Sequence, residues 1–238
     1  MKVDVLVFAA HPDDAELGCS GTIASLVKEG KKVGMIDITK GELGTRGTPQ
    51  LREKEAKEAA DILGVAVREN AGIPDGNIEN TKGNQLKLIR LIRRYRPDIV
   101  LCNAPYDRHP DHGHASTLVS ESVFYSGLVK ISTRDDGKEQ QAWRPSYVYH
   151  YIQDRAITPD IVVDITKYWD IKEASIYAYK SQFYNPDNDE PETYISSRHF
   201  MDFIKSRAQT AGHIIGADYG EGFVAARTPG IKSLYDLI

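Results

Sequence analysis

The stretch Val3-Asp4-Val5-Leu6-Val7-Phe8-Ala9-Ala10-His11-Pro12-Asp13-Asp14 starts as a mostly apolar run and ends in one imidazole and two carboxylates. A short apolar run that leads into a turn predicts a buried strand over residues 3–9. In open α/β sheets, ligands bind beyond the carboxyl ends of the strands. The stretch therefore predicts both the first strand of the fold and one side of a functional site.

Outward from this stretch, short β-branched runs alternate with helical patterns, which is typical of βαβ units. We predict strands over 3–9, 33–39, 65–68, 98–102, 146–151 and 160–165. We predict helices before Gly30 and over 48–64, 82–95, 112–126, 167–180 and 198–213. The expected fold class is α/β, with a mostly parallel sheet and helices on both faces. The polar segment 132–141 is expected to be a loop and is a candidate mobile lid.

Length and composition indicate how many domains to expect and which kinds of partner are excluded. The 238 residues contain no linker or compositional break, so we expect a single domain over residues 1–238. The net charge of −4, with acids and bases interspersed, argues against a nucleic-acid partner. No apolar run approaches ~18 residues, and we expect no membrane segment and a cytoplasmic location. Cys19 and Cys102 are too few for a disulfide framework.

A second His-Pro-Asp triplet occurs about a hundred residues after the first, in the cluster Arg108-His109-Pro110-Asp111-His112. This cluster follows the apolar run 98–102, just as the first follows 3–9. A single His-Pro-Asp is a common turn, in which Pro fixes φ and Asp caps a helix. Two copies, each at a predicted strand end, favour one site built from both.

The residue types in these clusters fit catalytic zinc, which takes three protein ligands and lowers the pKa of a bound water to about 7. The candidate ligands are His11, Asp14 and His112. Asp13 is a candidate general base, able to take a proton from attacking water and return it to a departing amine. His109, as a cation, is a candidate to stabilise the oxyanion of a tetrahedral intermediate.

The ligand set alone does not choose the reaction. Two histidines and one carboxylate also form the facial triad of non-haem iron oxygenases. Asp13 and His109 favour hydrolysis, because amide hydrolysis needs both proton transfer and oxyanion stabilisation. A third possibility is a non-catalytic sugar-binding or metal-storage protein. The presence of Asp13, a candidate general base, argues against it. Asp111 is a candidate to orient either histidine ligand.

The glycine-rich segment Gly41-Glu42-Leu43-Gly44-Thr45-Arg46-Gly47-Thr48 follows the second predicted strand. Its glycines permit close approach of the backbone to a ligand. It lacks the ending of a P-loop and the glycine pattern of a dinucleotide fold, so nucleotide binding has little support. We expect it to face substrate.

Together, the two His-Pro-Asp clusters and the Gly41-Glu42 to Gly44 loop resemble the LmbE/PIG-L family of zinc-dependent N-acetylglucosamine deacetylases. Four further stretches are similar to the branch that acts in bacillithiol biosynthesis: His11 to Gly18, Arg52-Glu53-Lys54-Glu55, Tyr179-Lys180-Ser181-Gln182-Phe183 and Tyr219-Gly220-Glu221-Gly222-Phe223. The resemblance covers nearly the whole chain.

This resemblance implies a Rossmann-like fold with the zinc beyond the strand ends. It implies hydrolysis of the N-acetyl group of N-acetyl-glucosaminyl malate to glucosaminyl malate and acetate. The family's metal ligands map to His11, Asp14 and His112, its general base to Asp13 and its oxyanion-stabilising histidine to His109. Another divalent ion such as Fe²⁺ is the alternative to zinc. The alternative substrates are other N-acetylglucosaminides, such as a chito-oligosaccharide or a mycothiol-type precursor.

The expected substrate contacts are Arg52, Arg108, Asp75 and Glu42 of the glycine loop. The forked guanidinium groups of Arg52 and Arg108 suit sugar hydroxyls or malate carboxylates. Asp75 is a candidate acceptor for sugar hydroxyls. The alternative for Arg52 is a solvated position on a helix. The resemblance also implies a homo-oligomer, a hexamer in this branch.

Overall fold

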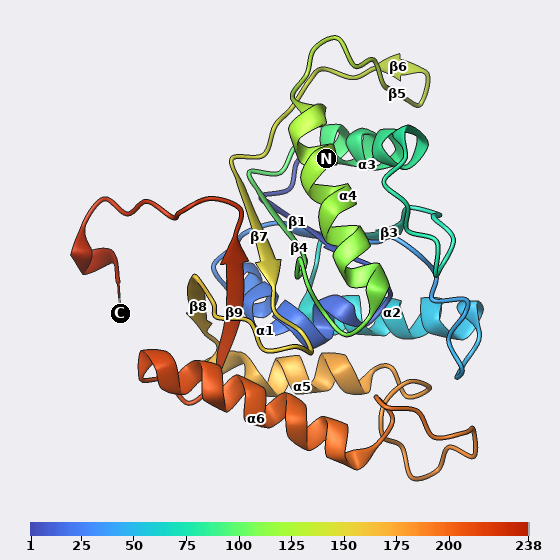
Figure 1. Ribbon diagram of the computed structural model, residues 1–238, viewed down its shortest axis with the longest axis vertical. Helices are drawn as coiled ribbons and strands as arrows, with labels where there is room; N and C mark the ends of the chain where they lie inside the picture. Colours follow the sequence, from blue (N-terminus) through green and yellow to red (C-terminus); the bar gives the residue numbers. More distant parts are fainter. Residues whose placement is uncertain (238) are drawn as a thin grey trace.

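A seven-stranded sheet in the order β3-β2-β1-β4-β7-β9-β8 forms the centre of the molecule (Figure 1). Its strands are β1 (Val5–Ala9), β2 (Val33–Asp37), β3 (Val67–Asn70), β4 (Ile99–Asn103), β7 (Tyr147–Tyr151), β8 (Ile161–Asp164) and β9 (Gly220–Ala225). The pairs from β3 across to β7 are parallel, and β9 is antiparallel to both neighbours. The computed structural model describes residues 1–237; Ile238, the last residue of the predicted domain, lies outside the described residues.

Helices cover both faces of this sheet. On one face lie α3 (Lys82–Tyr95) and α4 (Pro110–Ser126), which pack on Leu6 and Phe8 of β1. On the other lie α1 (Asp14–Lys28) and α2 (Pro49–Leu63), against Val5 and Val7. Because alternate residues of a strand point to opposite faces, a strand buried on both faces is apolar throughout. This explains the continuous apolar run of β1.

Two further helices, α5 (Trp169–Tyr177) and α6 (Arg198–Ile215), pack outside α1 and α2 (Figure 1). Short 3-10 turns precede α5 and end the described chain, at Thr166–Tyr168 and Leu234–Asp236. Within residues 1–237, no helix has the length and apolar character required to cross a membrane.

The order of the strands places the functional edge of the sheet. From β1 the chain moves outward to β2 and β3, then returns to the other side of β1 with β4. The gap between β1 and β4 is therefore the topological switch point, where α/β proteins bind ligands. Both His-Pro-Asp clusters follow these two strands, so the fold itself brings them together.

The predicted α/β class with a mostly parallel sheet and helices on both faces is confirmed. The prediction missed β9, because glycine is depleted in strands and Gly220 and Gly222 flank Glu221. Gly220 is required by packing, since a Cβ there would lie 2.8 Å from the backbone nitrogen of Gly212 in α6. The predicted helix 112–126 begins two residues earlier, at Pro110.

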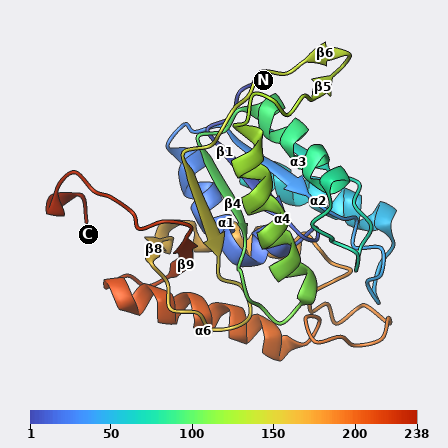
Figure 2. The ribbon, with the colours of Figure 1, turned by 45° about the horizontal axis from the view of Figure 1, so that its top comes forward.

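Segment 132–141, the candidate lid, does not line the cavity of the two His-Pro-Asp clusters. It contains a small hairpin of β5 (Arg134–Asp135) and β6 (Lys138–Glu139), and Asp135 pairs with Arg94 near the end of α3. Figures 1 and 2 both place this hairpin at the end of the molecule opposite α6. The seventeen residues of α4, about 25 Å of helix, separate it from the second His-Pro-Asp cluster.

Candidate metal centre and active site

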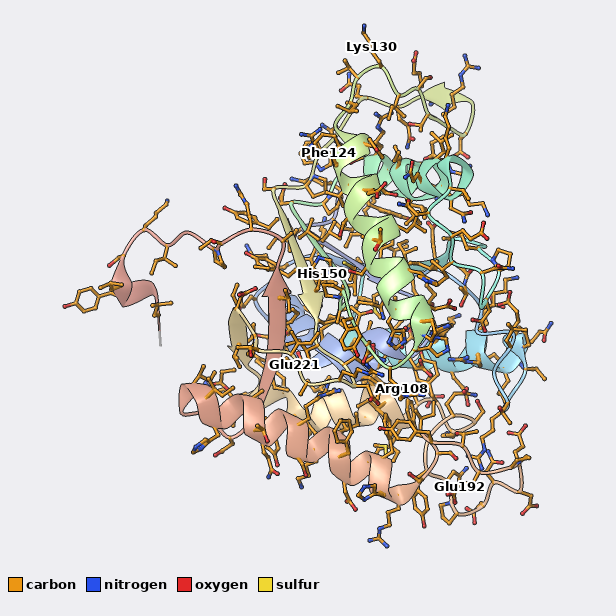
Figure 3. All side chains as sticks on the ribbon, viewed as in Figure 1. Arg108, Phe124, Lys130, His150, Glu192 and Glu221 are labelled. Carbon is orange, nitrogen blue, oxygen red and sulfur yellow. The ribbon has the colours of Figure 1, made fainter. Side chains whose placement is uncertain are left out.

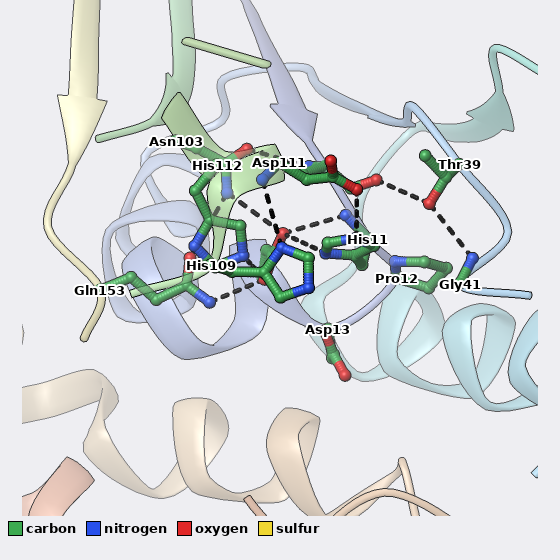
Figure 4. Close-up of polar contacts among 12 residues, drawn as sticks. His11, Pro12, Asp13, Thr39, Gly41, Asn103, His109, Asp111, His112 and Gln153 are labelled. Carbon is green, nitrogen blue, oxygen red and sulfur yellow. Dashed lines mark hydrogen bonds and ion pairs between the residues drawn. The ribbon is translucent and has the colours of Figure 1, made fainter. Parts of the chain in front are cut away.

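The turn after β1 places three candidate residues within four positions. Asp13 has φ of 116°, a value that non-glycine residues rarely adopt and that is concentrated at functional sites. The backbone N–H of His11 donates to Asp14 Oδ2 at 2.9 Å, which closes the turn. In Figure 4 the Asp13 carboxylate points away from the histidine rings, whereas His11 lies among them.

The Asp14 carboxylate lies between two histidines. Its Oδ1 is 3.1 Å from His112 Nε2, and its Oδ2 is 3.4 Å from His11 Nδ1. Gln153 Nε2 donates to Oδ1 at 2.7 Å, and Asn103 Nδ2 donates to Oδ2 at 3.1 Å. Asn103 ends β4 and Gln153 follows β7, so three neighbouring parallel strands position this one carboxylate.

The outer nitrogen of each histidine faces another carboxylate. His112 Nδ1 lies 2.6 Å from Asp107 Oδ2. His11 Nε2 lies 3.0 Å from Asp75 Oδ1 and 3.2 Å from Asp111 Oδ2. Because carboxylates only accept, these outer nitrogens carry the hydrogens. His11 Nδ1 and His112 Nε2, both facing Asp14, are therefore the nitrogens available to a metal, and the carboxylates behind them fix the ring orientations.

These donors fit a divalent ion. Zinc takes imidazole nitrogens and carboxylate oxygens as ligands, and each of these ring nitrogens lies close to one oxygen of Asp14, at 3.1 and 3.4 Å. A lone-pair nitrogen next to a carboxylate oxygen requires a cation between them, either a proton or a metal ion. Although burial opposes the charged ring, Asp14 and Asp107 raise the pKa of His112 to about 9. One ring nitrogen from each of His11, His109 and His112 also lies within 4.8 Å of the other two.

Arg52, an expected substrate contact, lines the cavity and pairs with Asp13. Its Nη2 donates to Asp13 Oδ2 at 2.9 Å and to the carbonyl of Pro12, and its Nη1 donates to the carbonyl of Gly41. A Cβ at Gly41 would lie 1.9 Å from that Nη1, so this glycine makes room for Arg52. Burial raises the pKa of Asp13 to about 7, even though the guanidinium of Arg52 opposes the rise.

His109 caps α4 and lies beside both proposed ligand rings. Its Nδ1 accepts the backbone N–H of Asp111 at 3.2 Å, so its neutral ring carries hydrogen on Nε2. Burial, together with the positive charges of His11 and His112, lowers the pKa of His109. The expected cation does not agree with this environment. The neutral Nε2–H group still provides a hydrogen-bond donor.

Asp75 and Glu42 hold loops together. Asp75 Oδ2 accepts the backbone N–H of Leu43 at 2.9 Å while Oδ1 contacts His11. Glu42 is exposed and accepts the backbone N–H groups of Asp75 and Lys40. Asp75 is thus a partner of His11 that also lines the cavity, and Glu42 joins the glycine loop to the loop of Asp75.

A cavity of about 350 Å³ opens above these groups. Besides the turn after β1, it is lined by the glycine loop, by Arg108, and by Thr193, Tyr194 and Ile195 from the segment before α6. The Arg108 guanidinium stacks on the Tyr194 ring at 4.4 Å and lies 3.5 Å from Asp154. Figure 3 shows Arg108 where the start of α4 approaches α6. Half-exposed at the cavity wall, Arg108 remains a candidate for substrate contact.

Four site residues were missed from the sequence: Asn103, Asp107, Gln153 and Tyr194. Two carried a usable signal, since Asn103 ends the apolar run of β4 and Gln153 lies just beyond β7, at the same edge as the His-Pro-Asp clusters. Asp107 lies next to the second cluster in the sequence, but no pattern there indicates that it contacts a histidine. Nothing in the sequence connected Tyr194 to the site.

In sequence and fold, this chain is similar to several known proteins. The family described as PIG-L, GlcNAc-PI de-N-acetylase, matches residues 6–123. The diacetylchitobiose deacetylase of Thermococcus kodakarensis is 30% identical over 191 residues, covering 75% of this chain and 70% of that protein. A probable N-acetyl-alpha-D-glucosaminyl L-malate deacetylase 2 of Bacillus anthracis is 26% identical, covering 75% and 81%. The crystal structure of the conserved protein TT1542 from Thermus thermophilus has a TM-score of 0.87 at 36% identity, covering 98% of each chain.

Proposed function

This chain belongs to the PIG-L/LmbE family of N-acetylglucosamine deacetylases, and from that premise we propose that it hydrolyses the N-acetyl group of N-acetyl-glucosaminyl malate. The observation that carries the proposal is the Asp14 carboxylate between His11 and His112, with Asp13 and His109 lining the same cavity. This arrangement supplies a metal site, a base and a hydrogen-bond donor within one small volume.

In the proposed reaction His11 Nδ1, Asp14 and His112 Nε2 would hold the ion. When bound, a divalent ion supplies Lewis acidity and an acidified water. Asp13 accepts the proton of the attacking water and returns it to the departing amine as the C–N bond breaks. A pKa of about 7 suits both transfers. His109 Nε2–H donates to the carbonyl oxygen as negative charge develops there.

The malate conjugate is favoured by the charge of Arg108 in the cavity wall. The planar fork of Arg108 can bind a carboxylate through two parallel hydrogen bonds. The stack on Tyr194 fixes the plane of that fork. A substrate with a carboxylate on the aglycone gains this contact, whereas free N-acetylglucosamine does not.

A chito-oligosaccharide is the second candidate, because the Thermococcus relative is a diacetylchitobiose deacetylase and matches more closely than the Bacillus anthracis protein. A second sugar would place hydroxyl groups at Arg108 in place of a carboxylate. Neutral acceptors gain less from an arginine than carboxylates do. The two candidates therefore predict different effects of removing the Arg108 charge.

The test is acetate release from three substrates: N-acetyl-glucosaminyl malate, diacetylchitobiose and N-acetylglucosamine. Each is measured after chelation and again after zinc is added back. We expect metal-dependent turnover that is fastest on the malate conjugate. Arg108→Met should raise KM for that substrate at least about tenfold. The matched control is Arg155→Met, because Arg155 also stacks on a tyrosine, Tyr106.

The outcomes separate the candidates. Fastest turnover of diacetylchitobiose, with KM insensitive to Arg108→Met, would assign the chito-oligosaccharide. Absence of turnover on all three substrates would refute the deacetylase proposal for these aglycones. We also propose zinc as the resident ion, with Fe²⁺ as the alternative, to be decided by elemental analysis of protein purified without added metal. The hexamer stays a prediction, tested by sedimentation.

A further inference from the structure

Helix α1 is interrupted just after the turn that carries Asp14. Cys19 has φ of −147° and ψ of 18°, far from helical values. The break separates a short first half, Asp14 to Gly18, from the longer remainder. In an unbroken helix, the N–H group of Gly21 would donate to the carbonyl of Leu17. Here that N–H group donates to a side chain from another element.

The side chain is that of Glu221 on β9. Its carboxylate accepts the N–H groups of Gly21 at 3.0 Å and Thr22 at 2.7 Å, and the hydroxyl of Thr22 at 2.6 Å. Figure 3 shows Glu221 on β9 beside the ribbon of α1. The donors left free on the far side of the break are thus satisfied by one buried carboxylate.

Lys172 on α5 binds the carbonyl groups on the other side of the break. Its ammonium donates to the carbonyls of Glu16 at 3.0 Å and Leu17 at 2.9 Å, and to Glu221 at 2.7 Å. A lysine has three donors, so all are used. Arg207 on α6 adds a second bond to the carbonyl of Leu17, at 2.7 Å. A continuous path therefore runs from the amides beyond the break, through Glu221 and Lys172, to the carbonyls before it.

This pair is deeply buried. Lys172 is 1% exposed and Glu221 is 4% exposed. Burying two charges is unfavourable unless they are paired and their remaining hydrogen-bonding groups are satisfied. Both conditions are met here, by the two sides of the same helix break. Lys172 and Glu221 line a different cavity from the one that contains the histidines, so the pair is not in contact with a reacting group.

The short half of α1 is also clamped from the sheet side. Gly18 packs so closely on the ring of Tyr151 that a Cβ would lie 2.3 Å from its Cδ2 atom. The hydroxyl of Tyr151 donates to the carbonyl of Phe8 in β1 at 3.0 Å. The turn that carries Asp14 is therefore fixed between β1 and β7 on one side and Lys172 on the other. The end of this short half, at Glu16 and Leu17, depends on Lys172 because its carbonyls bond to the Lys172 ammonium.

We propose that Lys172 and Glu221 are positioning residues that hold the first turn of α1 so that Asp14 meets His11 and His112, and that they thereby set the affinity of the metal site. This inference rests on the proposed function of that site. It also assigns a task to the Gly220-Glu221-Gly222 stretch, which the catalytic proposal does not use.

The test compares metal-free wild type with Lys172→Met and Glu221→Gln. Zinc affinity is measured by competition with a chromophoric chelator, and folding is checked by near-ultraviolet circular dichroism. We expect both variants to bind zinc at least tenfold more weakly while remaining folded. Hydrogen exchange at the amides of Gly21 and Thr22 should accelerate in Glu221→Gln.

The matched control is Arg93→Met. Arg93 is also a buried cation, 4% exposed, and it donates to the carbonyls of Ser126, Leu128 and Ile131 near the far end of α4. Its loss should lower stability without changing zinc affinity. An equal loss of affinity in Arg93→Met would overturn the inference by showing that affinity merely follows stability.

Wild-type zinc affinity in folded Lys172→Met protein would also overturn it. If both charge variants fail to fold, Thr22→Val replaces them, because it keeps the ion pair and removes only one bond to Glu221. Zinc affinity several-fold weaker in Thr22→Val supports the inference, and unchanged affinity refutes it. Wild-type protein that binds no zinc would refute the proposed function itself, which is a distinguishable result.

Discussion

Removal of the metal should make the stability of this protein fall steeply between pH 6.5 and 9. The ring of His112 lies between two carboxylates, with Nε2 at 3.1 Å from Asp14 and Nδ1 at 2.6 Å from Asp107. Against the effect of burial, these carboxylates raise the pKa of His112 from 6.5 to about 9. Without a metal ion, a proton must occupy the space between Nε2 and Asp14.

The sign follows from the raised pKa. The folded state binds this proton more tightly than the unfolded state, so the stabilisation is complete below pH 6.5 and is lost as pH rises through 9. Each pKa unit corresponds to 1.36 kcal/mol, so the loss by pH 9 amounts to about 3 kcal/mol. His11, whose pKa is also raised, adds in the same direction. A bound metal replaces these protons and should remove most of the pH dependence.

The assay is urea unfolding of chelator-treated and zinc-loaded protein at pH 6.5 and at pH 9. His112→Gln should reduce the difference between the free energies of unfolding of the metal-free protein at pH 6.5 and pH 9. His114→Gln is the matched control, because His114 lies on the same helix with an exposed side chain. Equal free energies of unfolding for the metal-free protein at the two pH values would refute the reasoning. An unchanged difference between the two pH values in His112→Gln would refute it as well.

Four further outcomes are expected. Asp13→Asn should keep zinc but lose at least about 100-fold in hydrolysis, measured by acetate release; wild-type turnover of metal-loaded protein would reject Asp13 as the base. Arg52→Met removes the charge that opposes protonation of Asp13, so the acidic limb of kcat/KM should move about one to three units to higher pH; an unmoved limb contradicts this. Asp107→Asn should weaken zinc binding about 10–100-fold in chelator competition, and unchanged affinity would show that the ring of His112 is oriented otherwise. Asp135→Asn should leave kcat and KM unchanged, because Asp135 is remote from the cavity. It should lower the free energy of unfolding in urea by at most about 1 kcal/mol, because its ion pair with Arg94 is partly exposed. A change in kcat or KM would show that segment 132–141 does act as a lid.

Sequence alone was sufficient for the fold class and for the meeting of the two His-Pro-Asp clusters. Runs such as residues 3–9 are apolar at nearly every position, which a strand buried on both faces explains. Parallel strands end at one edge of the sheet, so residues that follow β1 and β4 had to converge. These are local patterns, and each is complete within a few residues of chain.

Tertiary structure alone decided which partner each side chain finds. The sequence allowed Arg52 to be a substrate contact or a solvated helix residue; the structure buries it against Asp13, in the lining of the cavity, which excludes the solvated position. From the sequence, Asp111 could orient either histidine and Asp107 was not singled out; the distances assign Asp111 to His11 and Asp107 to His112. Glu221 lies 200 residues from the amide of Gly21 that it satisfies. Such pairings depend on the three-dimensional approach of distant segments and on exclusion of water, and neither is encoded in any local pattern of residues.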